Sequence, residues 1–224
     1  AYAHRMIDHD NGTGLIDALD RLSAVYQARV SPFLAASVNH EASEGMQGQT
    51  VALSSYLQLG DADFSAAGTD RLLDLCLTRT AVTADGLSKI EPQQNLRWLD
   101  LSFLPVDNKE VLRLCVSASS LEQLSLEATR VDDSIRQWLS QAERLRELDL
   151  SSTAIGDATI VALPETLPIE TLWLTGSKIT DASIDRIIAM KSLQRVDFQR
   201  TGVSGIGLNR LIASRPDLQI NPLE

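Results

Sequence analysis

The feature that most constrains this chain is a leucine-rich phrase that returns at an almost fixed interval. Six copies begin at Leu72, Leu96, Leu121, Leu145, Ile169 and Leu193, so successive copies start 24, 25, 24, 24 and 24 residues apart. Each copy reads L-x-x-L-x-L-x-x-[T/S/L]-x-[V/I]. A period of this length is typical of a solenoid, in which each repeat forms one supersecondary unit and buries its apolar edge only against its neighbours. The pattern therefore predicts one elongated domain.

Two periodicities succeed each other within every repeat. The L-x-L segment alternates in the manner of a short β-strand. After the closing Val or Ile, apolar residues recur about five and eight positions later, which is the spacing of one face of a short helix. These pairs are Leu87 and Ile90, Val111 and Leu114, Ile160 and Leu163, Ile184 and Ile187, and Leu208 and Leu211. Each repeat is thus predicted to be strand, turn, helix and return.

An aspartate stands near the start of several predicted helices, at Asp85, Asp133, Asp157 and Asp181. A carboxylate in this place can accept hydrogen bonds from the free N–H groups of the first turn, and it interacts favourably with the helix dipole. We therefore expect these four residues to stabilise the starts of their own helices.

The two ends of the chain depart from the repeat. Residues 1–48 carry apolar residues at helical spacing between Leu15 and Tyr26 and a short apolar run at 33–38, so we predict an α-helical N-terminal cap with a second short helix at 33–38. Residues 49–224 form the predicted array, with a degenerate first repeat at Val51-Ala-Leu53, about six full repeats and a truncated final strand at 215–220. Because Pro222 cannot donate to a further ladder, we expect the array to end there.

From about Val51 to Ile220 the sequence resembles leucine-rich-repeat proteins. Residues 148–157 (LDLSSTAIGD) and 172–181 (LWLTGSKITD) are most similar to the helix-backed variety common in bacterial extracytoplasmic proteins, and a related pattern occurs in substrate-recognition subunits of ubiquitin ligases. The resemblance implies an α/β horseshoe with a parallel sheet on the concave side and helices on the convex side. It also implies protein recognition through the concave sheet, seldom catalysis. Leu104 in place of a small residue and Phe198 in place of a leucine depart from the pattern but stay apolar.

Composition removes several classes of function. The formal net charge is −10, whereas nucleic-acid phosphates and anionic membrane surfaces both require a basic protein surface. No stretch approaches the roughly 20 apolar residues of a membrane helix, so we expect no membrane insertion by this segment. The chain lacks an initiator Met and a signal-type run, which favours a portion of a longer protein.

The cysteines leave the compartment open. Cys76 and Cys115 are the only two in the chain, and they fall on opposite sides of the predicted solenoid, so a disulfide between them is not expected. Free thiols fit a reducing compartment but do not exclude an oxidising one. The family resemblance, in turn, favours an extracytoplasmic bacterial location over a cytoplasmic one.

The sequence offers little for catalysis or metal binding. All three histidines precede the array, at His4, His9 and His40, so no imidazole can be placed against a concave Ser or Cys. The run Asp8-His-Asp-Asn-Gly12 is only loosely similar to a calcium loop, because Leu19 stands where the bidentate Glu belongs. A metal site needs convergent ligands, and Cys76 has no base in reach. We expect no enzyme activity, no metal and no cofactor.

The strand pattern also predicts which side chains line the concave sheet. The residues that flank the central apolar residue of each strand should point outward, together with the two residues after the last apolar one. Nine of these positions are our candidate partner-binding residues: Trp98, Asp100, Phe103, Glu127, Glu147, Asp149, Trp173, Arg195 and Asp197. Trp98 and Trp173 lie three repeats apart, about 14 Å at the usual strand spacing. Trp138 belongs to the predicted helix with Ile135 and Leu139 and is expected to pack on the convex side.

Three hypotheses of function remain. Exposed tryptophan is over-represented at binding hot spots, and carboxylates on one face favour a basic partner. The first hypothesis is therefore a monomeric, non-enzymatic module that binds a protein or peptide, with a basic or mixed segment favoured. The second is glycan binding, in which Trp98 and Trp173 stack on sugars while Asp100, Asp149 and Asp197 accept hydrogen bonds from hydroxyls. The third is a structural spacer of a longer protein, in which the tryptophans lie flat over neighbours and the acids only keep the chain soluble.

Overall fold

The computed structural model describes residues 38–39, 49–52, 72–90, 92, 94–116 and 118–221. The predicted N-terminal helices, apart from residue 38, lie outside these residues, as do the three histidines and the run at 8–12. Strand β1 (Val38–Asn39) pairs antiparallel with β2 (Gln49–Ala52). The short helix predicted at 33–38 is therefore wrong at Val38, where sheet pairing determines the backbone conformation.

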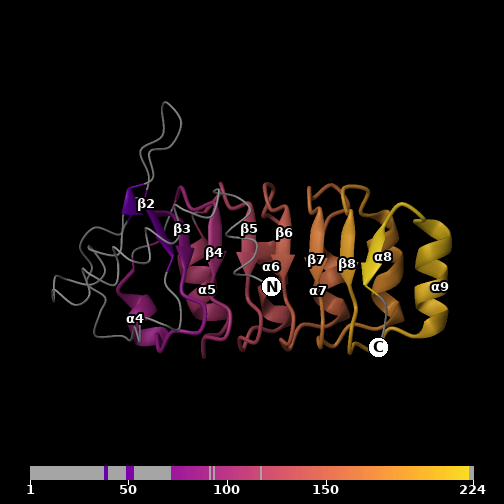
Figure 1. Ribbon diagram of the computed structural model, residues 1–224, viewed down its shortest axis with the longest axis horizontal. Helices are drawn as coiled ribbons and strands as arrows, with labels where there is room; N and C mark the ends of the chain where they lie inside the picture. Colours follow the sequence, from indigo (N-terminus) through magenta and orange to yellow (C-terminus); the bar gives the residue numbers. More distant parts are fainter. Residues whose placement is uncertain are drawn as a thin grey trace.

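The described strands form one sheet in which they follow each other in chain order (Figure 1). Strands β2 to β9 run parallel. Beyond β2 they are β3 (Leu72–Cys76), β4 (Trp98–Asp100), β5 (Gln123–Ser125), β6 (Glu147–Asp149), β7 (Thr171–Trp173), β8 (Arg195–Asp197) and β9 (Gln219–Asn221). Val51 pairs with Leu75, which confirms the strand of the predicted degenerate first repeat.

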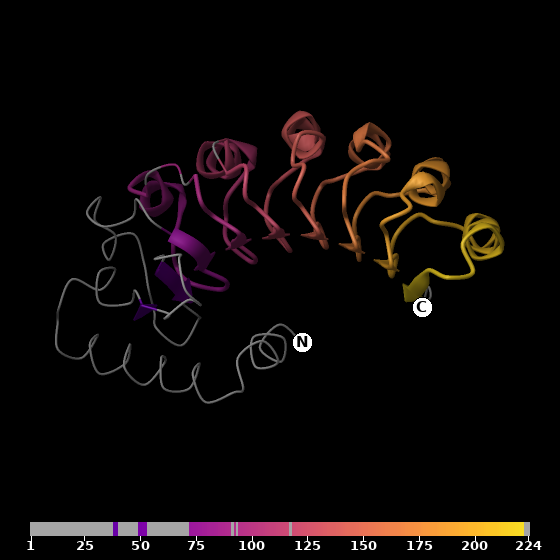
Figure 2. The ribbon, with the colours of Figure 1, turned by 90° about the horizontal axis from the view of Figure 1, so that it is seen from above.

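One short helix follows each strand from β3 to β8. The helices are α4 (Ala84–Ser88), α5 (Asn108–Cys115), α6 (Arg136–Leu139), α7 (Asp157–Ala162), α8 (Ile184–Ala189) and α9 (Gly205–Ser214), and 3₁₀ turns η3 (Asp133–Ile135) and η4 (Asp181–Ser183) lead into α6 and α8. Figure 2 shows the repeats along an arc, with strands on the inner side and helices on the outer side. Packed helices lie 8–10 Å apart and strands only about 4.8 Å apart, so stacking identical repeats bends the array toward its strands. The predicted α/β horseshoe is confirmed.

The core lies between the sheet and the helices. The central strand residues, among them Leu99, Leu148 and Leu172, are fully buried, and burial of each such side chain contributes about 1.5–3 kcal/mol. Leu104 and Phe198, the two departures from the repeat pattern, are also buried. All the predicted helix pairs are buried except at Leu208, which is half-buried on the last described helix.

A row of hydroxyl side chains explains the small residue in the third segment of the repeat phrase. Each hydroxyl donates to the carbonyl of the residue three positions earlier, at 2.6–2.9 Å, in Thr80, Thr129, Thr153, Ser177 and Thr201. This side-chain bond occupies a carbonyl at the end of the strand and favours the turn that follows. Leu104 has no hydroxyl and packs into the core instead.

The aspartates near the helix starts connect adjacent repeats. Oδ1 of Asp133 accepts hydrogen bonds from the backbone N–H groups of Gly156 and Thr159, at 2.9 and 3.2 Å, and from the Thr159 hydroxyl at 2.6 Å. Asp157 accepts in the same way from the N–H and hydroxyl of Thr180, at 2.9 and 2.6 Å. Each acceptor and its donors thus belong to consecutive repeats.

Our expectation that these aspartates accept hydrogen bonds from the first turn of their own helices is wrong for Asp133, Asp157 and Asp181. All three do stand in the first turn, where a carboxylate interacts favourably with the helix dipole. The residue before each of them already occupies the N-cap position, at Asp132, Gly156 and Thr180. The aspartate therefore stands at the first helical position, from which its carboxylate reaches the following repeat. Asp181 accepts from the N–H and hydroxyl of Ser204, at 2.8 and 2.5 Å.

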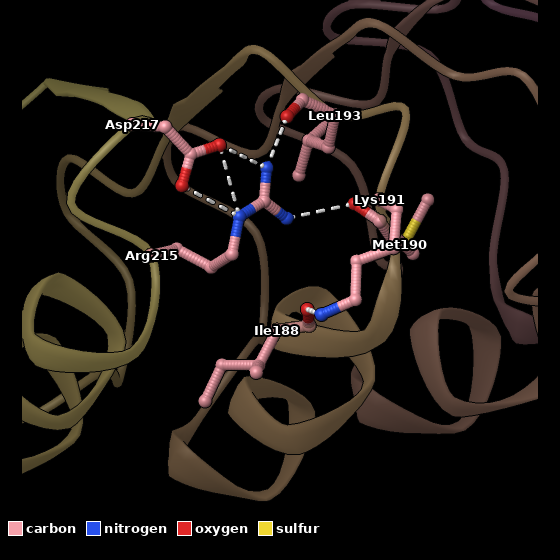
Figure 3. Close-up of polar contacts among 6 residues, drawn as sticks. All are labelled: Ile188, Met190, Lys191, Leu193, Arg215 and Asp217. Atoms are coloured by element: carbon pink, nitrogen blue, oxygen red, sulfur yellow. Dashed lines mark hydrogen bonds and ion pairs between the residues drawn. The ribbon is translucent and has the colours of Figure 1, made fainter.

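A buried arginine closes the last described repeat (Figure 3). The guanidinium of Arg215 donates to the carbonyl of Met190 at 2.9 Å and to that of Leu193 at 2.7 Å. Both carboxylate oxygens of Asp217 accept from the same guanidinium at 2.8–3.1 Å. These bonds from Arg215 hold the pKa of Asp217 below its usual range. The final strand is therefore shorter than predicted: β9 begins at Gln219, and residues 215–218 make the turn before it.

Candidate binding surface on the concave sheet

The strand register arranges the inner side chains of the arc in lateral rows. Because the central residue of each strand points into the core, the residues on either side of it point away from the helices. The first row is Asp74, Trp98, Gln123, Glu147, Thr171, Arg195 and Gln219, and the second is Cys76, Asp100, Ser125, Asp149, Trp173, Asp197 and Asn221. We call these two rows, with the turn residues 78–79, 102–103, 127–128, 151–152, 175–176 and 199–200, the concave surface.

Both predicted tryptophans lie on the concave surface. Trp98 is on β4 and Trp173 on β7, three strands apart, which corresponds to about 14 Å at the usual strand spacing. Each indole is half-buried, so it contacts its neighbours and keeps part of its surface accessible. Trp173 lies in register between Asp149 on β6 and Asp197 on β8. The sheet therefore holds two large aromatic groups at a fixed separation.

Three of the predicted site carboxylates are buried, and the expectation that they point into solvent is wrong. Asp100, Asp149 and Asp197 are 1%, 3% and 8% exposed. Each accepts, at 2.9 Å, the backbone N–H of the residue two positions later, where the strand has ended and that N–H needs a partner. The Asp197 carboxylate accepts two more hydrogen bonds: Thr175 donates to one oxygen at 2.8 Å and Asn221 donates to the other at 2.9 Å. These aspartates therefore stabilise the turns that follow β4, β6 and β8.

Burial raises the pKa of two acids on the concave surface, Asp100 and Glu127. It raises the pKa of Asp100, although the hydrogen bonds from Ser102 oppose the effect. Burial also raises the pKa of Glu127, and the neighbouring carboxylates of Asp149 and Asp100 add to that rise. Glu127 is half-buried, as is Glu147 on β6. The negative charge of the concave surface is therefore concentrated over β4 to β6.

The two cysteines are free and buried. Burial raises the pKa of the Cys76 thiol, with the Asp100 charge as a further cause, and the thiol donates to Asp100 at 3.7 Å. Burial alone raises the pKa of Cys115 to about 12. Neither side chain has the thiolate character that a nucleophile needs at neutral pH.

A row of left-handed residues edges the concave surface, and sequence reasoning did not anticipate it. The second turn residue of every repeat has positive φ, between 54° and 68°: Arg79, Phe103, Ala128, Ser152, Gly176 and Arg200. Only one of the six is glycine, so the residue type gave no clear signal. Phe103 is 39% exposed, and the Arg79 guanidinium lies over its ring at 4.3 Å from the centroid. Phe103 is thus exposed at this edge of the concave surface, with a cation stacked on its ring.

Positive charge on the concave surface lies toward both ends, with Arg79 after β3 and two arginines at the C-terminal repeats. Arg195 on β8 and Arg200 in the turn after it are both exposed. None of the ion pairs among the described residues involves either side chain. The concave surface is therefore acidic at β4 to β6 and basic at β8.

Trp138 is placed as predicted, on the convex side. It lies in α6, is partly buried against the core, and its indole N–H donates to the carbonyl of Cys115 at 3.2 Å. The bond joins two consecutive repeats. This tryptophan therefore has a structural role.

The part of the chain that the structure describes contains no group of three or more His, Cys, Asp and Glu side chains arranged to hold a metal ion. No helix in this part has the length and apolar character needed to cross a membrane.

No protein-family model matches the chain, and no curated protein matches it in sequence. Among solved structures, it is similar to a leucine-rich-repeat protein of Leptospira interrogans, at 19% identity and a TM-score of 0.38 over 67% of this chain and 49% of that one. It is also similar to internalin C2 of Listeria monocytogenes, at 17% identity and a TM-score of 0.43 over 73% of this chain and 83% of that one. The chain spans about half the length of the Leptospira protein. Such likenesses concern the fold alone.

Proposed function

We propose that this leucine-rich-repeat solenoid is a non-enzymatic module that binds a partner protein or peptide on its concave surface. The observation that carries the proposal is the set of three aromatic side chains, Trp98, Phe103 and Trp173, held partly exposed on a rigid sheet. Aromatic side chains of this kind dominate the binding energy of protein interfaces. Because the hydrogen-bonded strands fix their separation, little conformational freedom is lost on binding.

The surrounding charges support a protein partner more than a glycan. The glycan hypothesis relies on Asp100, Asp149 and Asp197 as acceptors for sugar hydroxyls, but all three are buried and bonded to backbone N–H groups. The accessible charges of the candidate site are Glu127, Glu147 and Arg195 instead. Half-exposed acids beside an exposed base favour complementary charges on a protein segment.

The experiment that tests the proposal compares two variants of the 224-residue chain. Trp98→Ala/Trp173→Ala removes two of the aromatic groups from the concave surface, whereas Ile206→Ala removes an apolar side chain that is 82% exposed on α9, on the outer side of the arc. Partners are captured from the native source, identified, purified and titrated against each folded variant. We expect the double variant to lose about 30-fold or more in affinity, because hot-spot truncations cost at least about 2 kcal/mol each, and the control to lose nothing.

Other outcomes have distinct meanings. Equal affinity of the double variant and the wild type would show that the tryptophans only pack on the sheet. A shift of tryptophan fluorescence on titration with oligosaccharides, without a captured protein, would favour the glycan hypothesis. No partner and no fluorescence response would leave the spacer hypothesis.

A further inference from the structure

We infer that the partner is an extended protein segment with two opposite charges, which places a basic side chain against Glu147 and a carboxylate against Arg195, with an apolar side chain near Trp173. This inference rests on the proposed function and adds the chemical class of the partner. It follows from the position of these three residues on neighbouring strands and from the charges around them.

The geometry sets the spacing of the two charges. Glu147, Thr171 and Arg195 are register partners on β6, β7 and β8, so the acid and the base are two strand spacings apart, about 10 Å. Trp173 is on the strand between them, two residues after Thr171, and therefore on the same face. A segment that crosses these strands along the first row meets Glu147, Thr171 and Arg195 in that order, with Trp173 about 7 Å to one side of Thr171 along β7.

The positive end retains a charge for the partner. Arg195 is exposed, and the closest acid on its own strand, Asp197, has both carboxylate oxygens engaged by Gln199, Thr175 and Asn221. Arg200 adds a second exposed cation in the turn after β8. A carboxylate on the partner is the complementary group for this end.

The negative end is reinforced by its neighbours. Asp149 lies on β6 with Glu147, and Glu127 follows β5. The mutual effect of these acids is visible in the raised pKa of Glu127, for which burial is the main cause and Asp149 the next. Gln123 on β5 donates to Glu147 at 3.4 Å, so the two register partners are in contact. A basic side chain is favoured here and a second acid is disfavoured.

The charges thus discriminate between classes of partner. A uniformly basic segment would place a cation against Arg195, and a uniformly acidic segment would place an anion against Glu147. Only a segment with separated opposite charges is complementary to both Glu147 and Arg195. Repulsion between like charges therefore disfavours uniformly basic and uniformly acidic segments. An extended polyproline-II segment repeats its side-chain direction every three residues, about 9 Å, and this length matches the separation of the two sites.

The test uses three synthetic 12-residue peptides and the full 224-residue chain. The first carries Lys and Glu three residues apart around Pro-Leu, the second has the same composition in scrambled order, and the third has Lys in place of the Glu. Dissociation constants are measured by fluorescence anisotropy at low salt. We expect the first peptide to bind roughly five- to tenfold more tightly than the other two, which is the effect of two exposed charge contacts.

Charge variants locate the effect. Arg195→Glu should remove the preference for the first peptide and make the all-basic peptide the tightest. Arg136→Glu, the same charge change on α6 at the outer side of the arc, should leave the order unchanged. Equal binding of the first two peptides, an unchanged order in Arg195→Glu, or no binding of any peptide would each overturn the inference.

The two proposals fail in different ways. Binding that ignores charge order but is lost in Trp98→Ala/Trp173→Ala overturns only the requirement for opposite charges and supports the interaction module. Binding that survives in that double variant overturns both. When no peptide binds, the capture experiment above decides the module independently.

Discussion

Arg215 shows how one residue can complete the last described repeat of a solenoid. In Figure 3 its guanidinium points at two main-chain carbonyls from the preceding repeat and at the carboxylate of Asp217. Arg113 in α5 makes the same kind of contact near the N-terminal end of the described array, where its guanidinium donates to the carbonyls of Ile90 and Leu87. Planar guanidinium groups suit this task because they offer several donors in a fixed arrangement.

Replacement of Arg215 by Ala should therefore destabilise the C-terminal repeat. The change leaves the Leu193 carbonyl without the Arg215 donor and the Met190 carbonyl with only the Leu193 N–H, and we expect the free energy of unfolding to fall by about 2–4 kcal/mol. Urea denaturation followed by circular dichroism measures the change. Asp217→Asn is the control: Asp217 is exposed and the carbonyl bonds remain in this variant, so its effect should be clearly smaller. Equal losses in both variants would contradict this account.

The buried carboxylate of Asp100 gives a prediction with a defined pH dependence. Its pKa is higher in the folded chain than in the unfolded chain, chiefly through burial, so the folded state binds the proton more tightly. The ionised form therefore reduces stability at pH 7, and this loss disappears as the pH falls below the unfolded pKa of about 3.9. Asp100→Asn keeps an acceptor for the Ser102 N–H without the charge.

We expect Asp100→Asn to have the higher urea midpoint at pH 7, with the difference from the wild type shrinking as the pH is lowered toward 4. Urea titrations at several pH values between 7 and 4 measure it. A difference that stays constant over this range would show that burial of the charge is not the cause.

At single residues, sequence reasoning predicted position better than conformation. Strand alternation correctly assigned Trp98 and Trp173 to the concave surface, because the leucines between them must face the core. It did not predict that Asp100 and its counterparts turn back onto backbone N–H groups, because that depends on the turn after the strand. The left-handed conformation of Phe103 was equally hidden, since most residues at that position are not glycine.

At the scale of elements, the bonds between repeats explain residues that composition alone does not. The strands coincide with the predicted L-x-L segments, since one apolar register aligns them all. The short helices were predicted in place, but the 3₁₀ turns that precede α6 and α8 were not. Their first residues serve the neighbouring repeat as much as the helix, as Asp133 shows. A pattern read within one repeat cannot reveal a contact made in the next.

The contribution of this contact can be measured by a matched pair of variants. Asp133→Ala leaves the fully buried Thr159 hydroxyl and the Gly156 N–H without their acceptor, whereas the Thr159 N–H keeps its bond to the Gly156 carbonyl. We expect the free energy of unfolding to fall by about 1.5–3 kcal/mol, the range for hydrogen bonds to a charged group. Asp85 stands in the first turn of α4, one position later than Asp133 relative to its N-cap, Thr83. It is exposed, and its carboxylate makes no hydrogen bond within the described residues. Asp85→Ala should change stability by less than about 0.5 kcal/mol, and a similar loss in both variants would contradict the assignment.

At the scale of the whole molecule, curvature and charge act together. Strands packed more closely than helices bend the array, and the bend brings the outward rows of consecutive strands onto one inner surface (Figure 2). The strand positions predicted an acidic concave face in a chain of net charge −10, but burial of three aspartates and exposure of Arg195 and Arg200 give it two opposite ends. Net charge sums over all residues and does not say which of them reach solvent.

In a solenoid each repeat is stabilised only by contacts with the adjacent repeats, and a variant of Asp181 can test this property. Its carboxylate connects η4 to Ser204, the N-cap of α9, and the bonds from Ser204 hold its pKa below the usual range. A lowered pKa in the folded chain means that the contact stabilises the fold above the unfolded pKa and that this stabilisation is lost as the pH falls through the folded pKa. At pH 7 the contact is fully formed.

We expect Asp181→Ala to weaken the last repeat and little else, because each repeat contacts only its neighbours. Native-state hydrogen exchange at pH 7, read by mass spectrometry, should show protection in α9 and β9 falling several-fold while β4 to β6 stay unchanged. Lowering the pH below the usual range of an aspartate should shrink the difference between variant and wild type, after correction for the pH dependence of intrinsic exchange. A uniform loss of protection along the whole array would show instead that the solenoid unfolds as one cooperative unit.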